Sequence, residues 1–375
     1  MKSLLLRLMI VLMLVSGIIV LPGCRSTSTA KSTHWLELLK TMPANENTKR
    51  DVYLNDFTKL NEKFAQNPQF QPVYTSYYHP LIGGGGYDEN EWRQTLTFTW
   101  KDMEQSIFAG SPSISGLPPF HIYQAVRCQF DKAKLDNAVK TGPLNDILQI
   151  VSYKGLQFYS WGDDNEINYS RRSTLRPLGQ GYRLALLDNY LFWIQWTDGM
   201  KEIIDTYNKD VGSLADKPDY QLLAGAMDDL DTTNAFFSSE SQSLGSIRTW
   251  RTQTPDQLIN GQDQRFLTAT DGSTLLKPFQ AYATGAGIDE KGSYLAIVLL
   301  NPDNSTARKN AELLATRISQ YQSVWQGLKW ADLVENMKIE SRGKLTVAKI
   351  YGPIAEYWTS FDKWNGTYEP LLITE

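Results

Sequence analysis

Histidine and cysteine are scarce in this chain, and that scarcity narrows the chemistry it can perform. Among 375 residues there are three histidines, His34, His79 and His121, and two cysteines, Cys24 and Cys128. A hydrolytic triad needs a histidine beside its nucleophile, and a zinc site needs several histidine or cysteine ligands. The sequence contains no G-x-S-x-G, H-E-x-x-H or His-x-His motif. We therefore expect no catalytic triad, no metal site and no bound cofactor.

Cys128 lies in the run Val126-Arg127-Cys128-Gln129-Phe130, which is typical of a strand. Side chains alternate between the two faces of a strand, so Cys128 should share one face with Val126 and Phe130. A thiol in such apolar surroundings has a raised pKa and reacts slowly. The pattern predicts a structural cysteine that points into the core.

Carboxylates gather in two short clusters, Asp163-Asp164-Asn165-Glu166 and Asp228-Asp229-Leu230-Asp231. The first lies between two apolar runs and favours a hairpin turn, and the second closes a predicted helix. Neither has the glycine and terminal glutamate of a calcium loop. Both are interpreted as solvated turns. A glycosidase pair assembled from distant acids stays open, because two catalytic carboxylates need no local signature.

The N-terminal segment has the order of features found in export signals. A short positive region precedes an almost wholly apolar run from Leu8 to Val20, which is shorter than the roughly 20 apolar residues of a comfortable membrane span. The run ends at Leu21-Pro22-Gly23-Cys24, which resembles the lipobox of bacterial lipoprotein signal peptides. That resemblance implies a diacylglyceryl group on the Cys24 thiol, cleavage after Gly23 and acylation of the new amino group. Two or three acyl chains anchor a protein stably, where one chain is marginal.

Composition changes directly after Cys24. The following residues are small and polar, which predicts a flexible tether over residues 24–34. Without residues 1–23, which include Lys2 and Arg7, the chain has 35 basic and 41 acidic residues and a net charge of −6. A mildly acidic body argues against nucleic acid as a partner and against broad contact with anionic lipid.

Periodicity in the body predicts strands mixed with helices. Residues 34–39 are expected to form a short amphipathic turn. The predicted helices are 56–64 with Asp56 as N-cap, 131–140, 198–209, 220–230 and 303–321, the last with the buried stripe Ala307, Ala311, Leu314 and Ile318. The predicted strands are 122–130, 153–161, 183–196 with a turn at Asp188-Asn189, 282–287, 294–301, and a hairpin of 338–341 and 345–351.

The order of these elements predicts an α+β fold of antiparallel sheets with flanking helices. We divide the chain into a signal peptide (1–23), a lipidated tether (24–34), a first α+β half (35–240) and a second (241–375), with the halves as a possible remote duplication. The body, over residues 35–370, loosely resembles uncharacterised exported lipoproteins that carry domains of unknown function, and this resemblance implies no activity.

These features predict a lipid-anchored protein of the cell membrane or outer membrane whose folded body lies outside the cytoplasm. The body is expected to be a non-enzymatic interaction or ligand-binding module of the envelope, whose partner is an unidentified envelope protein or small ligand. The alternative is an envelope hydrolase that acts on glycan or peptide through distant carboxylates. An enclosed pair of carboxylates about 5–10 Å apart would favour the hydrolase.

Overall fold

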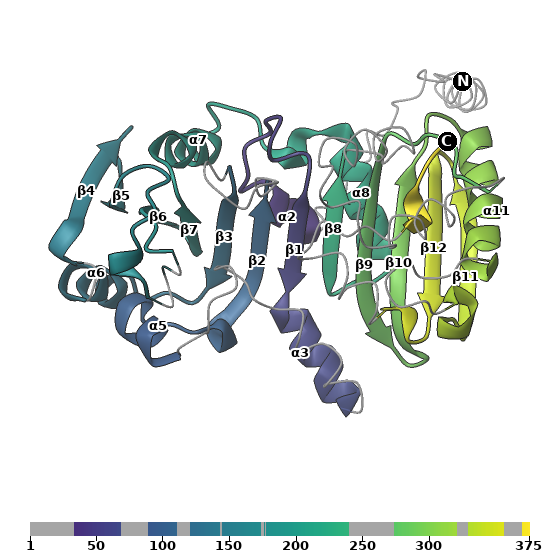
Figure 1. The fold of residues 1–375 in the computed structure, drawn as a ribbon, viewed down its shortest axis with the longest axis horizontal. Coiled ribbons are helices and arrows are strands. Elements are labelled where there is room, and N and C mark those ends of the chain that lie inside the picture. The colour runs from purple at the N-terminus through teal and green to yellow at the C-terminus, as the bar shows by residue number, and fades with distance from the viewer. Residues whose placement is uncertain are drawn as a thin grey trace, which may run out of the picture. The chain divides into compact units, whose positions relative to one another are not determined.

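A twelve-stranded antiparallel sheet forms the frame of the protein (Figure 1). The computed structural model describes residues 34–68, 89–110, 121–142, 145–173, 176, 178–239, 274–320, 329–355 and 370–375. Residues 34–375 form one compact unit, separate from residues 1–33. The predicted signal peptide and Cys24 lie outside the described residues.

The strands follow the order β11-β12-β10-β9-β8-β1-β2-β3-β7-β6-β5-β4 across the sheet. Their bounds are β1 Val52–Asp56, β2 Met103–Ala109, β3 Tyr123–Cys128, β4 Leu148–Tyr153, β5 Leu156–Trp161, β6 Tyr182–Leu187, β7 Tyr190–Ile194, β8 Asn234–Ser238, β9 Ala281–Asp289, β10 Gly292–Leu300, β11 Asn336–Arg342 and β12 Leu345–Tyr351. The described α-helices are α2 His34–Leu39, α3 Phe57–Gln66, α5 Glu89–Leu96, α6 Lys132–Thr141, α7 Thr197–Tyr207, α8 Pro218–Asp229 and α11 Asn304–Gln320.

Two runs of strands extend outward from the central neighbours β1 and β8. Beyond β1 come β2 and β3, and beyond β8 come β9 and β10. A helix follows the third strand in each run, α6 after β3 and α11 after β10. On the β3 side the two hairpins β4–β5 and β6–β7 then complete the sheet, whereas on the β10 side the single hairpin β11–β12 does so. The duplication of the two halves stays a prediction, because a similar order of elements does not establish common descent.

Helices cover both faces of the sheet. On one face, α2, α7 and α8 enclose a single large apolar cluster, to which β10 contributes Tyr294, Ala296 and Val298. The alternate residues of β10, such as Leu295 and Ile297, face a second cluster beneath α11. A third cluster lies on that same face under α5 and α6 and contains Val126 and Cys128. Alternation along the strands therefore divides the core into two layers.

Local signals position several elements as expected. The Asp56 side chain accepts a hydrogen bond from the Lys59 amide and caps α3, whose buried residues are Phe57, Leu60 and Phe64. Asp188, with φ +51°, forms the tight turn between β6 and β7. The predicted α+β class is correct.

Other predictions need correction. Residues 153–161 are not one strand, because Lys154 and Gly155 have positive φ and form a turn between β4 and β5. The three central strands β1, β2 and β8 were not predicted at all. On α11, Ala307, Leu314 and Ile318 are buried as expected and Ala311 is half-buried, but Asn310 and Arg317 are buried too. Among the described residues, no helix has the length and apolar character of a membrane span.

Candidate functional site

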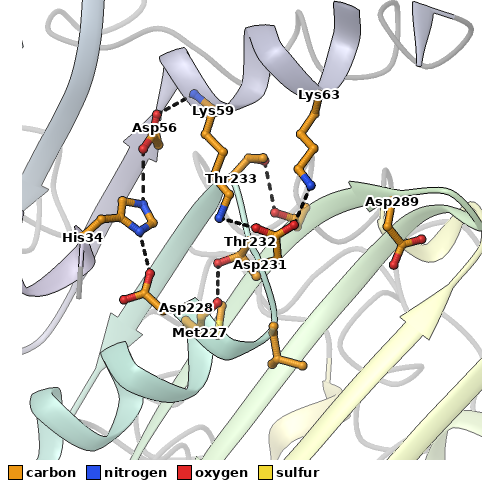
Figure 2. A network of polar contacts seen from close by, with 12 residues as sticks. His34, Asp56, Lys59, Lys63, Met227, Asp228, Asp231, Thr232, Thr233 and Asp289 are labelled. Carbon is orange, nitrogen blue, oxygen red and sulfur yellow. Dashed lines mark hydrogen bonds and ion pairs between the residues drawn. The ribbon is translucent and has the colours of Figure 1, made fainter. Parts of the chain in front are cut away.

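His34 lies between two aspartates where α2, β1 and α8 meet (Figure 2). Its Nδ1 atom is 2.5 Å from Asp228 Oδ1, and its Nε2 atom is 3.3 Å from Asp56 Oδ2. The Nδ1 contact is a hydrogen bond, whereas the Nε2 contact has the distance of an ion pair without hydrogen-bond geometry. The three side chains are mostly buried. Each ring nitrogen of His34 therefore faces an aspartate oxygen.

Asp56 has further partners besides His34. Its Oδ1 atom accepts from the Lys59 amide at 2.7 Å, and its Oδ2 atom accepts from Gln105 Nε2 at 3.2 Å. The carboxylate therefore lies at the N-terminus of α3, where the orphan amides and the helix dipole favour negative charge. One aspartate links α2, α3 and β2.

Asp231 is held by two lysines of α3 (Figure 2). Lys59 Nζ lies 2.7 Å from its Oδ1 atom, and Lys63 Nζ lies 2.5 Å from its Oδ2 atom. The lysines are four residues apart and therefore lie on the same helical face. Burial by itself would raise the pKa of Asp231, but the hydrogen bonds and charges of Lys59 and Lys63 outweigh burial, so its pKa lies below the usual value. The ion pairs of Asp231 with Lys59 and Lys63 thus connect α3 to the end of α8.

The end of α8 is shaped by the backbone at Asp231. This residue has φ +60°, in the left-handed region that aspartate tolerates better than most residues and that commonly follows a helix. Its amide donates to the Asp228 carbonyl at 2.9 Å. The Tyr294 hydroxyl lies 2.6 Å from the Leu230 carbonyl oxygen and 2.9 Å from that of Asp231. Asp228 and Asp231 contact different partners, since Asp228 lies in the last turn of α8 whereas Asp231 follows the helix in a left-handed conformation.

Asp289 forms a second ion pair, at the end of β9. It is 2.6 Å from Lys349 Nζ and accepts a hydrogen bond from the Tyr351 hydroxyl at 2.8 Å. Lys349 Nζ also lies 3.8 Å from the centroid of the Tyr294 ring, a favourable cation–π distance. Burial acts to raise the pKa of Asp289, but Lys349, the Lys291 amide and Tyr351 hold it below the usual value.

These contacts determine what the cluster can do chemically. A catalytic histidine uses one ring nitrogen for an orienting carboxylate and the other for a nucleophile or substrate. Both nitrogens of His34 face carboxylates. The nearby hydroxyls of Thr232 and Thr233 contact the carbonyls of Met227 and Ala286, both at 3.2 Å. The arrangement fixes α2, α3 and α8 to the sheet, and among the described residues no group of three His, Cys, Asp or Glu could hold a metal ion.

The other histidines and Cys128 are distributed elsewhere. His121 is exposed, and its ring lies edge-on against Trp196 at 5.3 Å. His79 lies outside the described residues. Cys128 is 1 % exposed beside Val126 in the core, as predicted, and burial raises the pKa of its thiol.

The first carboxylate cluster does not form the expected hairpin turn. Residues 162–181 separate β5 from its neighbour β6, and Asp164 reaches from this connection to the start of α7. Its Oδ1 atom accepts from the amide of Thr197 at 2.9 Å and from its hydroxyl at 2.8 Å, and lies 2.5 Å from Nη2 of the buried Arg183. A helix start and a buried guanidinium both need a negative partner, and Asp164 supplies it.

The second cluster closes α8 as predicted, and Asp229 is exposed, but Asp228 and Asp231 are held in ion pairs and are not simply solvated. Asp228 pairs with His34, 194 residues away, and Asp231 pairs with Lys59 and Lys63. The sequence did not indicate this network, since His34 begins α2 and its partners Asp56 and Asp228 lie 22 and 194 residues further along the chain.

Comparisons with known proteins give little further information. No protein-family model and no curated protein matches the chain. Solved structures of TP0453, described as crystal forms III and I, align with 86 % of this chain and with 96 % and 95 % of their own. Their sequence identities are 8 % and 10 %, and the TM-score is 0.39 for both. A likeness of this size assigns neither a family nor a function.

Proposed function

We propose that this protein is an exported lipoprotein, anchored through acyl chains on Cys24, with a folded body that acts as a non-enzymatic interaction or ligand-binding module of the cell envelope. The anchor follows from the order of a short basic region, an apolar run and Leu21-Pro22-Gly23-Cys24. The membrane is then the first partner, and the body lies outside the cytoplasm.

The entry of the chain into its folded body is the observation that best supports a tethered arrangement. The compact unit begins at His34, ten residues after Cys24. Fully extended, ten residues reach at most about 35 Å. Trp35, Leu38 and Leu39 of α2 are completely buried, and His34 is paired with two aspartates. Such an attachment would transmit the pull of an anchor directly to the core of the body.

The state of the charged groups supports an interaction module over a hydrolase. The acids at the meeting point of α2, α3 and α8 are engaged by His34, Lys59 and Lys63, each at ion-pair distance. Catalytic carboxylates in a glycosidase must instead face the substrate. The described network therefore supports a structural use of these acids.

Fatty-acid labelling of the two single-cysteine variants tests the anchor. Cells that produce the protein are fed an alkyne-bearing palmitate, and the protein is isolated and examined for label. Cys24→Ala should carry no label and should leave the membrane fraction or persist as an unprocessed precursor. The matched control is Cys128→Ala, which should be labelled like the parent protein because it retains Cys24. Full labelling of the Cys24→Ala variant would refute the proposal.

A further inference from the structure

The two edges of the described sheet differ in their protection against pairing (Figure 1). At one edge, β11 has the sequence NMKIESR, with Lys338, Glu340 and Arg342 joined as ion pairs, and α11 packs against it. Charged side chains and a covering helix are the usual ways to prevent an edge strand from pairing. At the other edge, β4 has the sequence LQIVSY and no charged residue.

β4 is also open to solvent. Gln149, Ile150 and Ser152 are exposed, and Ile150 retains 50 % of its accessible surface. Val and Ile are favoured in strands, and an exposed apolar side chain on an uncharged edge favours addition of another strand.

The turn after β4 determines which backbone groups face outward. Tyr153 is opposite Leu156 across the two-residue turn Lys154-Gly155, so these two residues exchange the hydrogen bonds that close the hairpin. The pattern alternates along the strand. The N–H and C=O groups of Leu148, Ile150 and Ser152 therefore point away from β5, toward the open edge.

We propose that this edge binds the β4 strand of a second copy of the chain, antiparallel, with Ile150 opposite Ile150 of the partner subunit. In this register each outward residue meets an outward residue, because Leu148 lies opposite Ser152 of the partner subunit. Antiparallel pairing of identical strands produces a two-fold symmetric interface, the commonest symmetry of dimers.

Charge favours a second copy as the occupant. β4 brings no charge to its own two-fold axis, so self-pairing creates no like-charge contact. The adjacent Lys154 is neutralised within its own chain by Asp205 at 2.7 Å and Asp210 at 2.6 Å. A self-pair of β4 is thus uncharged along its whole length. The contact is short and does not depend on the lipid, although confinement to a membrane would raise the effective concentration of copies.

Disulfide trapping in membranes of producing cells tests the pairing with the full chain. Directly opposite, hydrogen-bonded residues have Cα atoms about 5.5 Å apart, a distance that a disulfide can span. Ile150→Cys should therefore give a covalent dimer on mild oxidation. The matched control is Met337→Cys, a substitution of an exposed residue on the β11 edge, which should give no covalent dimer. Adding Ser152→Lys to Ile150→Cys should abolish the dimer, because it places a charge opposite the apolar Leu148.

Two readouts keep the outcome clear. Slow reaction of Cys128 with a thiol reagent reports that each variant is folded, since this thiol is buried. The parent protein should form no disulfide-linked dimer, because Cys128 is buried and β4 contains no cysteine. A disulfide through Cys24 would contradict the proposed lipidation without bearing on β4. Equal trapping of Ile150→Cys and Met337→Cys, or a folded Ile150→Cys that remains monomeric, would overturn the proposed pairing.

Discussion

Replacing Leu314 by alanine measures how strongly α11 is held to the sheet. Leu314 is completely buried in the cluster that also contains Ile297, Ile350 and Trp330. The substitution removes three carbon atoms, worth about 0.8 kcal/mol each in transfer free energy, or roughly 2.4 kcal/mol. The cavity left in a sheet-and-helix core adds to this, so we expect the free energy of unfolding to fall by about 3 kcal/mol, within the usual range of about 2–5 kcal/mol.

Leu222→Ala is the matched control, because Leu222 lies on α8 with 48 % of its surface exposed. The same chemical change there should cost less than about 1 kcal/mol, since little apolar surface returns to water. Both variants can be compared by urea unfolding followed through tryptophan fluorescence, with Trp330 in the perturbed cluster as one reporter. A loss below about 0.5 kcal/mol for Leu314→Ala would refute the burial of this face of α11.

Four further outcomes are expected. Gly285→Ala should lower the free energy of unfolding by about 1–3 kcal/mol, because a Cβ would lie 2.3 Å from the Asn234 carbonyl oxygen. Gly225→Ala should raise it by up to about 1 kcal/mol, because the site in α8 has room for a Cβ. Equal effects of the two substitutions in denaturant unfolding would contradict both expectations. The pKa of Asp231 is lowered in the folded state, so its contribution to stability is present above its unfolded pKa of about 4 and is lost as the pH falls further. Between pH 5 and pH 3 the free energy of unfolding should therefore fall less for Asp231→Asn than for the parent protein. His34→Ala should cost about 1–3 kcal/mol, since the mostly buried Asp228 loses its partner, and an unchanged denaturation midpoint would show that this pair adds nothing. Cys128 should react with a thiol reagent far more slowly in the native protein than in the denatured one, because burial raises its pKa; rapid native labelling would place it on the surface.

Local signals in the sequence were sufficient for the elements whose stability depends on near neighbours. The stripe on α11, the Asp56 cap of α3 and the turn at Asp188-Asn189 each involve residues a few positions apart. Periodicity also indicated the burial of Cys128. In these cases the interacting residues are only a few positions apart, so their spacing in the sequence predicts their contacts.

The centre of the sheet was not predictable in the same way. β1 and β8 are five residues long, and β8 is buried throughout, so neither shows a long alternating pattern. Asn310 and Arg317 of α11 are buried although the apolar pattern did not predict it, because their hydrogen-bond partners lie outside the helix. Asn310 donates to Lys277 and Asn301, and Arg317 donates to the carbonyls of Leu371 and Thr274. Such contacts cannot be predicted from local sequence patterns, because they form only when distant segments of the chain pack together.

The sequence by itself was therefore enough to predict lipidation at Cys24, the α+β class and the helices, caps and turns that depend on near neighbours. The tertiary structure decided the strand order, the pairing of His34 with Asp56 and Asp228, and the contrast between the β4 and β11 edges. The physical reason is range: helix periodicity, caps and tight turns act over a few residues, whereas sheet order and ion pairs between remote segments depend on how the whole chain packs.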